Sequence, residues 1–276
     1  MPLAAATTDR RRRSRFGRLL AATGAATVRR IQSLLVFAAF SATVIVAALR
    51  RESWRRPVRA VFFDSLRRVA VESAPTALGT GVLLGFALVS QVVYWLQTAG
   101  QSQLVGTIIE RLLVREIAPV VVGLIIFGRV GTRLIIDLGE ARPRGWLRQL
   151  ERQGIDPVAL LVMPRVVAHA IGAFCLSTLL LVSTLVTGYM IASALGLVTF
   201  PIWQFAQNVT RAMEVDDFIV PPAKCLVIGA MVALVCCATA LARGDGRYEV
   251  QRLVQRGFVR VALAILLVSA VFDLAV

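Results

Sequence analysis

Two adjacent charges, Arg115 and Glu116, stand at the start of a long apolar run, and their types suit the head group of an amphiphile. An arginine offers a planar fork of donors to a phosphate, while a glutamate balances the charge or meets an amine. Charges at membrane depth are costly, which favours a functional interpretation. An interfacial ion pair that only anchors the helix is the alternative. From the spacing alone, the anchoring ion pair is the favoured interpretation.

Other charged residues beside the apolar runs have simpler structural explanations. Lys224 and Asp273 are single charges near the ends of their segments, where side chains can extend to water and mean nothing further. Arg129, Arg133 and Asp137 lie four apart and share one helix face, so Arg133 and Asp137 can form a surface pair.

The sequence lacks the motifs of several common functional sites. The chain has no G-x-x-x-x-G-K-[ST] segment for ATP, and neither H-E-x-x-H nor G-x-S-x-G occurs. The single histidine, His169, has no partner ligand nearby in the sequence. The four cysteines lie in apolar runs without metal-ligand spacing and are interpreted as small buried hydrophobes. We therefore predict no catalytic residue, no metal and no cofactor bound by this chain.

The composition indicates that these residues are positioned by membrane spans. Hydrophobic residues make up 57% of the chain, against about 45–50% in soluble domains, and the mean hydropathy is +0.74. The net charge of +15 comes from basic residues that flank apolar segments. They form no basic face with interleaved aromatics, which argues against nucleic-acid binding. Cytoplasmic anchoring beside anionic lipids explains them better.

Residues 1–72 are predicted to be a basic N-terminal tail with an interfacial helix. Ile31–Leu49 is long enough to span, but arginines bracket it on both sides. A spanning helix would place one basic cluster outside, against the positive-inside rule. Lying along the cytoplasmic interface, or dipping in and returning, keeps both clusters inside, and we favour this over a span.

Residues 73–276 are predicted to be an all-α permease domain with five transmembrane helices. Gly81 and Gly85 form a GxxxG pair in the first helix, which allows a neighbouring backbone to approach closely. The apolar stretch 158–200 is assigned a single span with an elbow at Pro164-Arg165, because two spans would put the later basic block outside. The expected spans cover residues 74–96, 116–136, 169–195, 222–242 and 258–275. This topology places the N-terminus in the cytoplasm and the C-terminus outside.

From Gly81 to Asp273 the chain resembles the MlaE/YrbE permeases, the membrane subunits of Mla/Mce-type lipid ABC transporters. The similarity is carried by the segments GVLLGFALVSQ, VREIAPVVVGLIIFGRVG, LERQGIDP and MPR. Residues that fall on the family's pattern are Arg115, Glu116, Pro119, Gly128, Arg129, Gly131, Glu151, Gly154, Asp156, Pro157, Pro164, Arg165, Asp217, Lys224 and Asp273.

The resemblance implies a homodimer in the bacterial inner membrane that works with a cytoplasmic ABC ATPase and a periplasmic MCE-domain protein. It implies an outward-facing phospholipid pocket between the two copies, near Arg115 and Glu116 and faced by Gln91. ATP would be used by the partner ATPase. A cytoplasmic coupling helix between spans two and three would dock on that ATPase, and its candidate contact residues are Trp146, Leu147, Leu150 and Glu151.

The sequence departs from the family's pattern on the cytoplasmic side, at Ile136-Asp137, Arg144–Trp146 and Gly257-Phe258, so ATPase docking is the less well supported part. The resemblance favours an ATP-driven phospholipid permease. An ion-coupled secondary transporter and a non-transporting membrane scaffold are the alternatives. The first calls for ionisable relays and discontinuous helices in matched halves, and the second calls for no polar pocket.

Overall fold

The computed structural model describes residues 35–101, 104–141, 156–196, 201–213, 215–241 and 250–275, with residues 32, 149, 150 and 152–154. The chain divides into two compact units, Met1–Val46 and Ala47–Val276. The described part of the first unit is helical and belongs to the helix Leu35–Leu49, which is shorter than the five long apolar helices.

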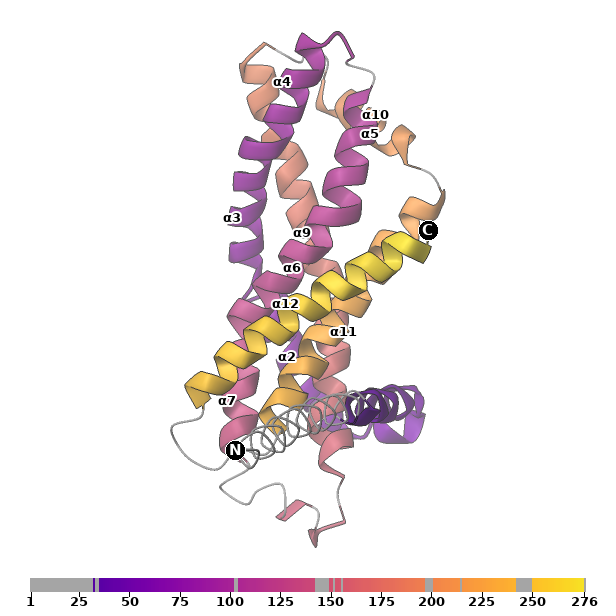
Figure 1. Cartoon of the computed structure of the whole chain (residues 1–276), viewed down its shortest axis with the longest axis vertical. Coiled ribbons are helices and arrows are strands. Elements are labelled where there is room, and N and C mark those ends of the chain that lie inside the picture. The colour runs from indigo at the N-terminus through magenta and orange to yellow at the C-terminus, as the bar shows by residue number, and fades with distance from the viewer. Residues whose placement is uncertain are drawn as a thin grey trace, which may run out of the picture. The chain divides into compact units, whose positions relative to one another are not determined.

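The described residues of this second unit form helices and turns, and five long apolar helices could each cross a membrane (Figure 1). This confirms the predicted fold class. After a short 3-10 turn, η1 (Arg51–Ser53), the first long apolar stretch begins with α2 (Arg56–Ala70) and, after a turn at residues 71–73, continues as α3 (Ala74–Leu84), the π-helical η2 (Gly85–Val89) and α4 (Ser90–Thr98).

The second long helix runs from Val105 to Ala141 and alternates α- and π-helical geometry. It begins well before the expected start near Glu116, because three charged residues just upstream depress the local hydropathy while the helical backbone continues through them. Its segments are α5 (Val105–Ile109), the π-helical η4 (Glu110–Ile117), α6 (Ala118–Ile126), the π-helical η5 (Phe127–Gly131) and α7 (Thr132–Ala141).

The third long helix is continuous through Pro164, where an elbow was expected. A proline ring clashes with the carbonyl four residues earlier and removes one hydrogen bond. The widened π-helical turn η6 (Val158–Val162) ends just before Pro164, and α9 (Met163–Ala194) continues from it. The π geometry thus accommodates the proline without a break.

The connection after α9 and the last two long helices complete the unit. A short amphipathic helix, α10, follows α9 and buries Phe205 and Val209 against α4, α5 and α9. The remaining elements are α10 (Ile202–Ala212), the 3-10 turn η7 (Val215–Phe218), α11 (Val220–Leu241) and α12 (Val250–Ala275).

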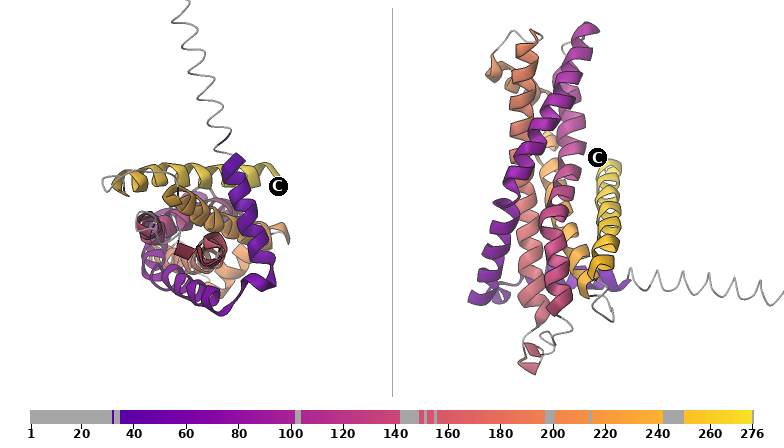
Figure 2. Two further views of the ribbon diagram at one scale, coloured as in Figure 1. Left: turned by 90° about the horizontal axis from the view of Figure 1, so that it is seen from below. Right: turned by 90° about the vertical axis from the view of Figure 1, so that its left-hand side faces the viewer.

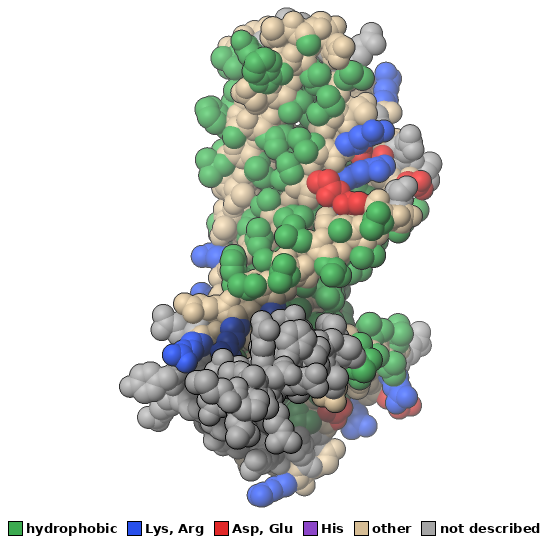
Figure 3. Space-filling model, in the orientation of Figure 1, with side chains coloured by type: hydrophobic (Ala, Val, Ile, Leu, Met, Phe, Trp, Pro, Cys, Tyr) green, Lys and Arg blue, Asp and Glu red, His purple; other side chains and the backbone are tan. Residues whose placement is uncertain are grey.

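Helices α9 and α11 form the centre of this unit. In its most apolar stretch α11 is 67% buried by the rest of the chain, whereas α12 is only 22% buried. Figure 2 shows α12 lying along one side of the bundle. On the face shown in Figure 3, apolar side chains are spread over the upper bundle, apart from one group of acidic and basic side chains near the C-terminal end of α12. A face of this kind suits lipid surroundings.

The first and third long helices approach each other closely at glycines. A Cβ on Gly81 would collide with Ser183, and a Cβ on Gly85 would lie 2.5 Å from the Thr184 carbonyl oxygen. From the facing side, a Cβ on Gly188 would collide with Val89. Such spacing brings the two backbones together, which is how small residues stabilise helix pairs in lipid.

Candidate functional site

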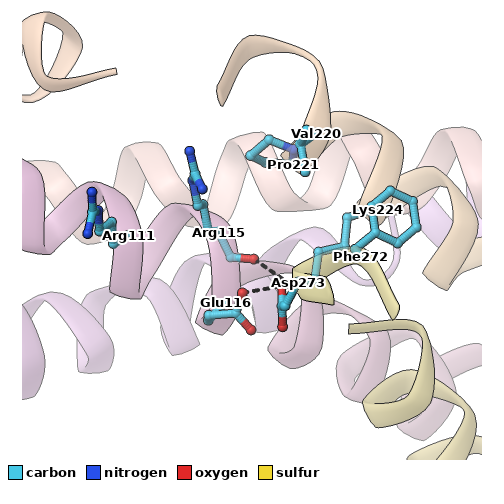
Figure 4. A pocket seen from close by; sticks show the side chains of 8 residues that line it. All are labelled: Arg111, Arg115, Glu116, Val220, Pro221, Lys224, Phe272 and Asp273. Atoms are coloured by element: carbon cyan, nitrogen blue, oxygen red, sulfur yellow. Dashed lines mark hydrogen bonds and ion pairs between the residues drawn. The ribbon is translucent and has the colours of Figure 1, made fainter. Parts of the chain in front are cut away.

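A cavity of about 370 Å³ lies where the second long helix meets α11 and the end of α12. Figure 4 shows side chains from all three helices converging on it. Its lining residues are Arg111, Arg115, Glu116, Val220, Pro221, Lys224, Phe272 and Asp273. Two charged clusters contribute side chains to its walls.

The arginine cluster consists of Arg115, Glu110 and Asp217. Arg115 Nε donates to Glu110 Oε1 at 2.9 Å and to Asp217 Oδ1 at 2.6 Å, and a terminal guanidinium nitrogen also pairs with Asp217. The Glu110 and Asp217 side chains are 3% and 1% exposed, whereas that of Arg115 is 30% exposed. The carboxylates are therefore the buried members, and the guanidinium faces the cavity.

Glu110 was not predicted as a site residue. Side chains three or four apart share a face of an α-helix, and Glu110 precedes Arg115 by five residues. The π-helical register of η4 widens the turn so that residues five apart come into line. The signal available in the sequence was Pro119, which disfavours a regular α-helical turn before it.

The lysine cluster consists of Lys224, Glu116 and Asp273. Lys224 Nζ donates to Glu116 Oε1 at 2.7 Å and to Asp273 Oδ1 at 2.9 Å. The Lys224 side chain is 2% exposed, while those of Glu116 and Asp273 are 41% and 46% exposed. The expectation that Lys224 and Asp273 only reach to water is therefore wrong, because the ammonium group is enclosed by partners from two other helices.

Two further bonds fix this cluster. Lys224 Nζ also donates to the backbone carbonyl of Arg115 at 3.0 Å. In an α-helix that carbonyl would accept from residue 119, but Pro119 has no N–H to donate. Ser269 Oγ donates to Glu116 Oε2 at 3.2 Å, which orients the carboxylate from α12.

The predicted site residues are only partly brought together. Arg115 and Glu116 line the cavity, and Gln91 is exposed on α4 and is not among the lining residues. Trp146, Leu147 and Glu151 of the predicted coupling helix lie outside the described residues. Leu150 is described, and it is buried within the chain.

The predicted surface pair takes a different partner. Arg133 pairs with Glu72 at 2.9 Å, and Arg129 donates to the Glu72 carbonyl at 3.0 Å. Both bonds tie the turn between α2 and α3 to the second long helix. Glu72 therefore takes the place of Asp137 as the ion-pair partner of Arg133.

Within the described residues, no group of three or more His, Cys, Asp or Glu side chains could hold a metal ion. His169 is buried and its Nδ1 lies 2.7 Å from the Arg165 carbonyl oxygen. Of the four free cysteines, Cys225, Cys236 and Cys237 are buried, but Cys175 is exposed on α9, so the expectation of burial is wrong for that one.

Comparison with known proteins covers most of the chain. The family model described as Permease MlaE matches residues 62–275. A probable ABC transporter permease protein of Synechocystis is 29% identical over 66% of this chain and 69% of its own length. A probable ABC transporter permease protein of Rickettsia typhi is 24% identical over 88% of this chain and 92% of its own length. The chloroplastic protein TRIGALACTOSYLDIACYLGLYCEROL 1 of Arabidopsis thaliana is 23% identical over 70% of this chain and 53% of its own length.

Proposed function

Because the chain belongs to the MlaE permease family, we propose that it is the membrane subunit of an ATP-driven transporter that moves phospholipid between the bacterial inner membrane and a periplasmic MCE-type carrier. In this proposal the chain forms a homodimer and holds no catalytic residue. A separate cytoplasmic ABC ATPase hydrolyses the ATP, and its docking segment on the permease is the coupling helix with Trp146 and Leu147.

The charged cavity is the observation that carries this proposal. A phospholipid needs apolar walls for its tails and a few polar groups at head-group depth. Here a guanidinium and two carboxylates face a cavity that Val220, Pro221 and Phe272 also line, and the outer surface nearby is largely apolar (Figure 3). The name of the Arabidopsis relative is that of a galactolipid, which is in keeping with a lipid substrate.

The same cavity argues against a scaffold without transport. Burying Lys224, Glu110 and Asp217 costs desolvation energy that well-packed apolar side chains would avoid. A protein that only holds partners together has no use for such a site. Transport also requires a partner that supplies energy, and the relatives from Synechocystis and Rickettsia typhi are described as probable ABC transporter permeases.

The test is purification of the full chain in mild detergent, expressed with its native neighbours. We expect glycerophospholipid and an ATPase with a P-loop sequence to be retained, as measured by mass spectrometry. The variant Trp146→Asp should release the ATPase and keep the lipid, because no residue of the predicted docking segment is among those that line the cavity. A folded wild-type chain that retains neither lipid nor ATPase would overturn the proposal.

A further inference from the structure

The cavity presents opposite charges on its two sides. Figure 4 shows Arg111 and Arg115 pointing to one side of the second long helix and Glu116 pointing to the other, toward Lys224 and Asp273. Arg111 is exposed, and it forms no ion pair or side-chain hydrogen bond within the described part of the chain. We call Arg111 and Arg115 the cationic side, and Glu116 and Asp273 the anionic side.

This division follows from which member of each cluster is buried. In the arginine cluster the two carboxylates are enclosed, so a positive group faces the cavity. In the lysine cluster the ammonium is enclosed, so two negative groups face it. The carboxylate oxygens on the anionic side are only partly used, because each half-exposed side chain has surface left for another donor.

We propose that the cavity selects a zwitterionic phospholipid whose head group carries a primary ammonium beside the phosphate, as phosphoethanolamine does. This inference rests on the proposed function, since it assumes that a phospholipid enters this cavity. The phosphate lies against Arg111 and Arg115, and the ammonium donates to Glu116 and Asp273. A charged donor and acceptor at each end make these bonds stronger than neutral ones.

The anionic side discriminates against other head groups. An anionic lipid such as phosphatidylglycerol has no cation for Glu116 and Asp273, so these two carboxylates keep only the single ammonium of Lys224 that they share, beside an added negative charge. A quaternary ammonium, as in phosphocholine, has no N–H to donate and is recognised mainly by several aromatic faces. Phe272 is the one aromatic residue that lines the described cavity. The expected order of occupancy is therefore ethanolamine, then choline, then glycerol.

Photo-crosslinking can measure lipid bound in the cavity separately from lipid that contacts the outer face of α12. A photo-crosslinking phenylalanine analogue replaces Phe272 in the full chain, and a second sample carries it at Leu263, an exposed apolar position of α12. Both are reconstituted in vesicles with equal parts of phosphatidylethanolamine, phosphatidylcholine and phosphatidylglycerol with identical tails. We expect phosphatidylethanolamine adducts at position 272 to be enriched about fivefold over phosphatidylglycerol, relative to the adducts at position 263.

A matched pair of variants tests the anionic side. Asp273→Asn keeps the size of the side chain and leaves Lys224 with Glu116 and the Arg115 carbonyl, so the fold is retained. We expect it to reduce the enrichment to about twofold or less. Asp64→Asn makes the same chemical change on α2, in an exposed pair with Arg68, and should leave the enrichment unchanged.

Each result has a defined meaning. Absence of any phospholipid adduct at position 272, with normal adducts at position 263, would overturn the proposed function itself. Adducts at position 272 with equal amounts of the three lipids, or with phosphatidylglycerol in excess, would overturn only the head-group inference. Enrichment that survives Asp273→Asn and Glu116→Gln together would overturn the assignment of selectivity to the anionic side.

Discussion

The arginine and lysine clusters use the same kinds of side chain in opposite ways. Arg115 is partly exposed and holds two enclosed carboxylates, whereas Lys224 is enclosed and holds two partly exposed carboxylates. An enclosed charge depends on its partner, because water cannot replace that partner. The comparison teaches that Arg115 has a structural role as well as a place in the cavity, while Glu116 and Asp273 are freer to act on a ligand.

The largest effect is expected from Arg115→Ala. This substitution leaves Glu110 and Asp217 enclosed without a counter-charge, so the free energy of unfolding should fall by about 3–5 kcal/mol. Thermal unfolding of the purified chain in detergent measures this loss. Arg115→Lys should be intermediate, because an ammonium lacks the planar fork that reaches both carboxylates.

Arg59→Ala serves as the control for this first prediction, since Arg59 is exposed on α2. It should leave the unfolding temperature nearly unchanged. A loss for Arg115→Ala no larger than that of Arg59→Ala would remove the structural role of the arginine cluster. Arg115 would then act only at the membrane surface or on the ligand.

A smaller effect is expected from Lys224→Met. Methionine fills most of the enclosed space, and the two remaining carboxylates are exposed enough to be hydrated, so the loss should be about 1 kcal/mol. The same thermal unfolding measurement applies. If Lys224→Met destabilised the chain more than Arg115→Ala, the contrast between the two clusters would be wrong.

The smallest effect is expected from Ser269→Ala. The serine hydroxyl donates a single 3.2 Å hydrogen bond to a half-exposed carboxylate, so its removal should cost about 0.5–1 kcal/mol. Equilibrium unfolding and the adduct ratio at position 272 check it together. A stable variant with reduced ethanolamine selectivity would show that Ser269 orients Glu116 for the ligand, whereas an unchanged ratio limits the serine to packing.

Much of the fold follows from hydropathy and the positions of the arginines, and the five long helices confirm this prediction. The residues at which these helices begin and end are predicted less accurately. Glu110 and Arg115 interrupt the apolar pattern of the second helix, yet the helix continues because other segments supply their partners. A hydropathy profile contains no information about such partners, since Asp217 is about a hundred residues away in the sequence.

The residues of the candidate site were also only partly predictable from the sequence. Arg115 and Glu116 were singled out by their charge and position, but their place near a pocket came from the family resemblance, which also included Asp217, Lys224 and Asp273. The enclosure of Lys224 was missed, because a lysine near a helix end usually reaches water. Only the packing of α11 between the second helix and α12 encloses it. Glu110 was missed because its alignment with Arg115 depends on a π-helical turn.

Pro119 gives the second helix a mechanical link to α11. The Arg115 carbonyl, which cannot bond to residue 119, accepts a hydrogen bond from Lys224 instead. A sliding or separation of α11 would remove that donor and would pull on two carboxylates at the same moment. Any rearrangement that opens this part of the bundle must therefore hydrate the Arg115 carbonyl, Glu116 and Asp273 together, so that opening of the charged cavity and loosening of the helix are one event.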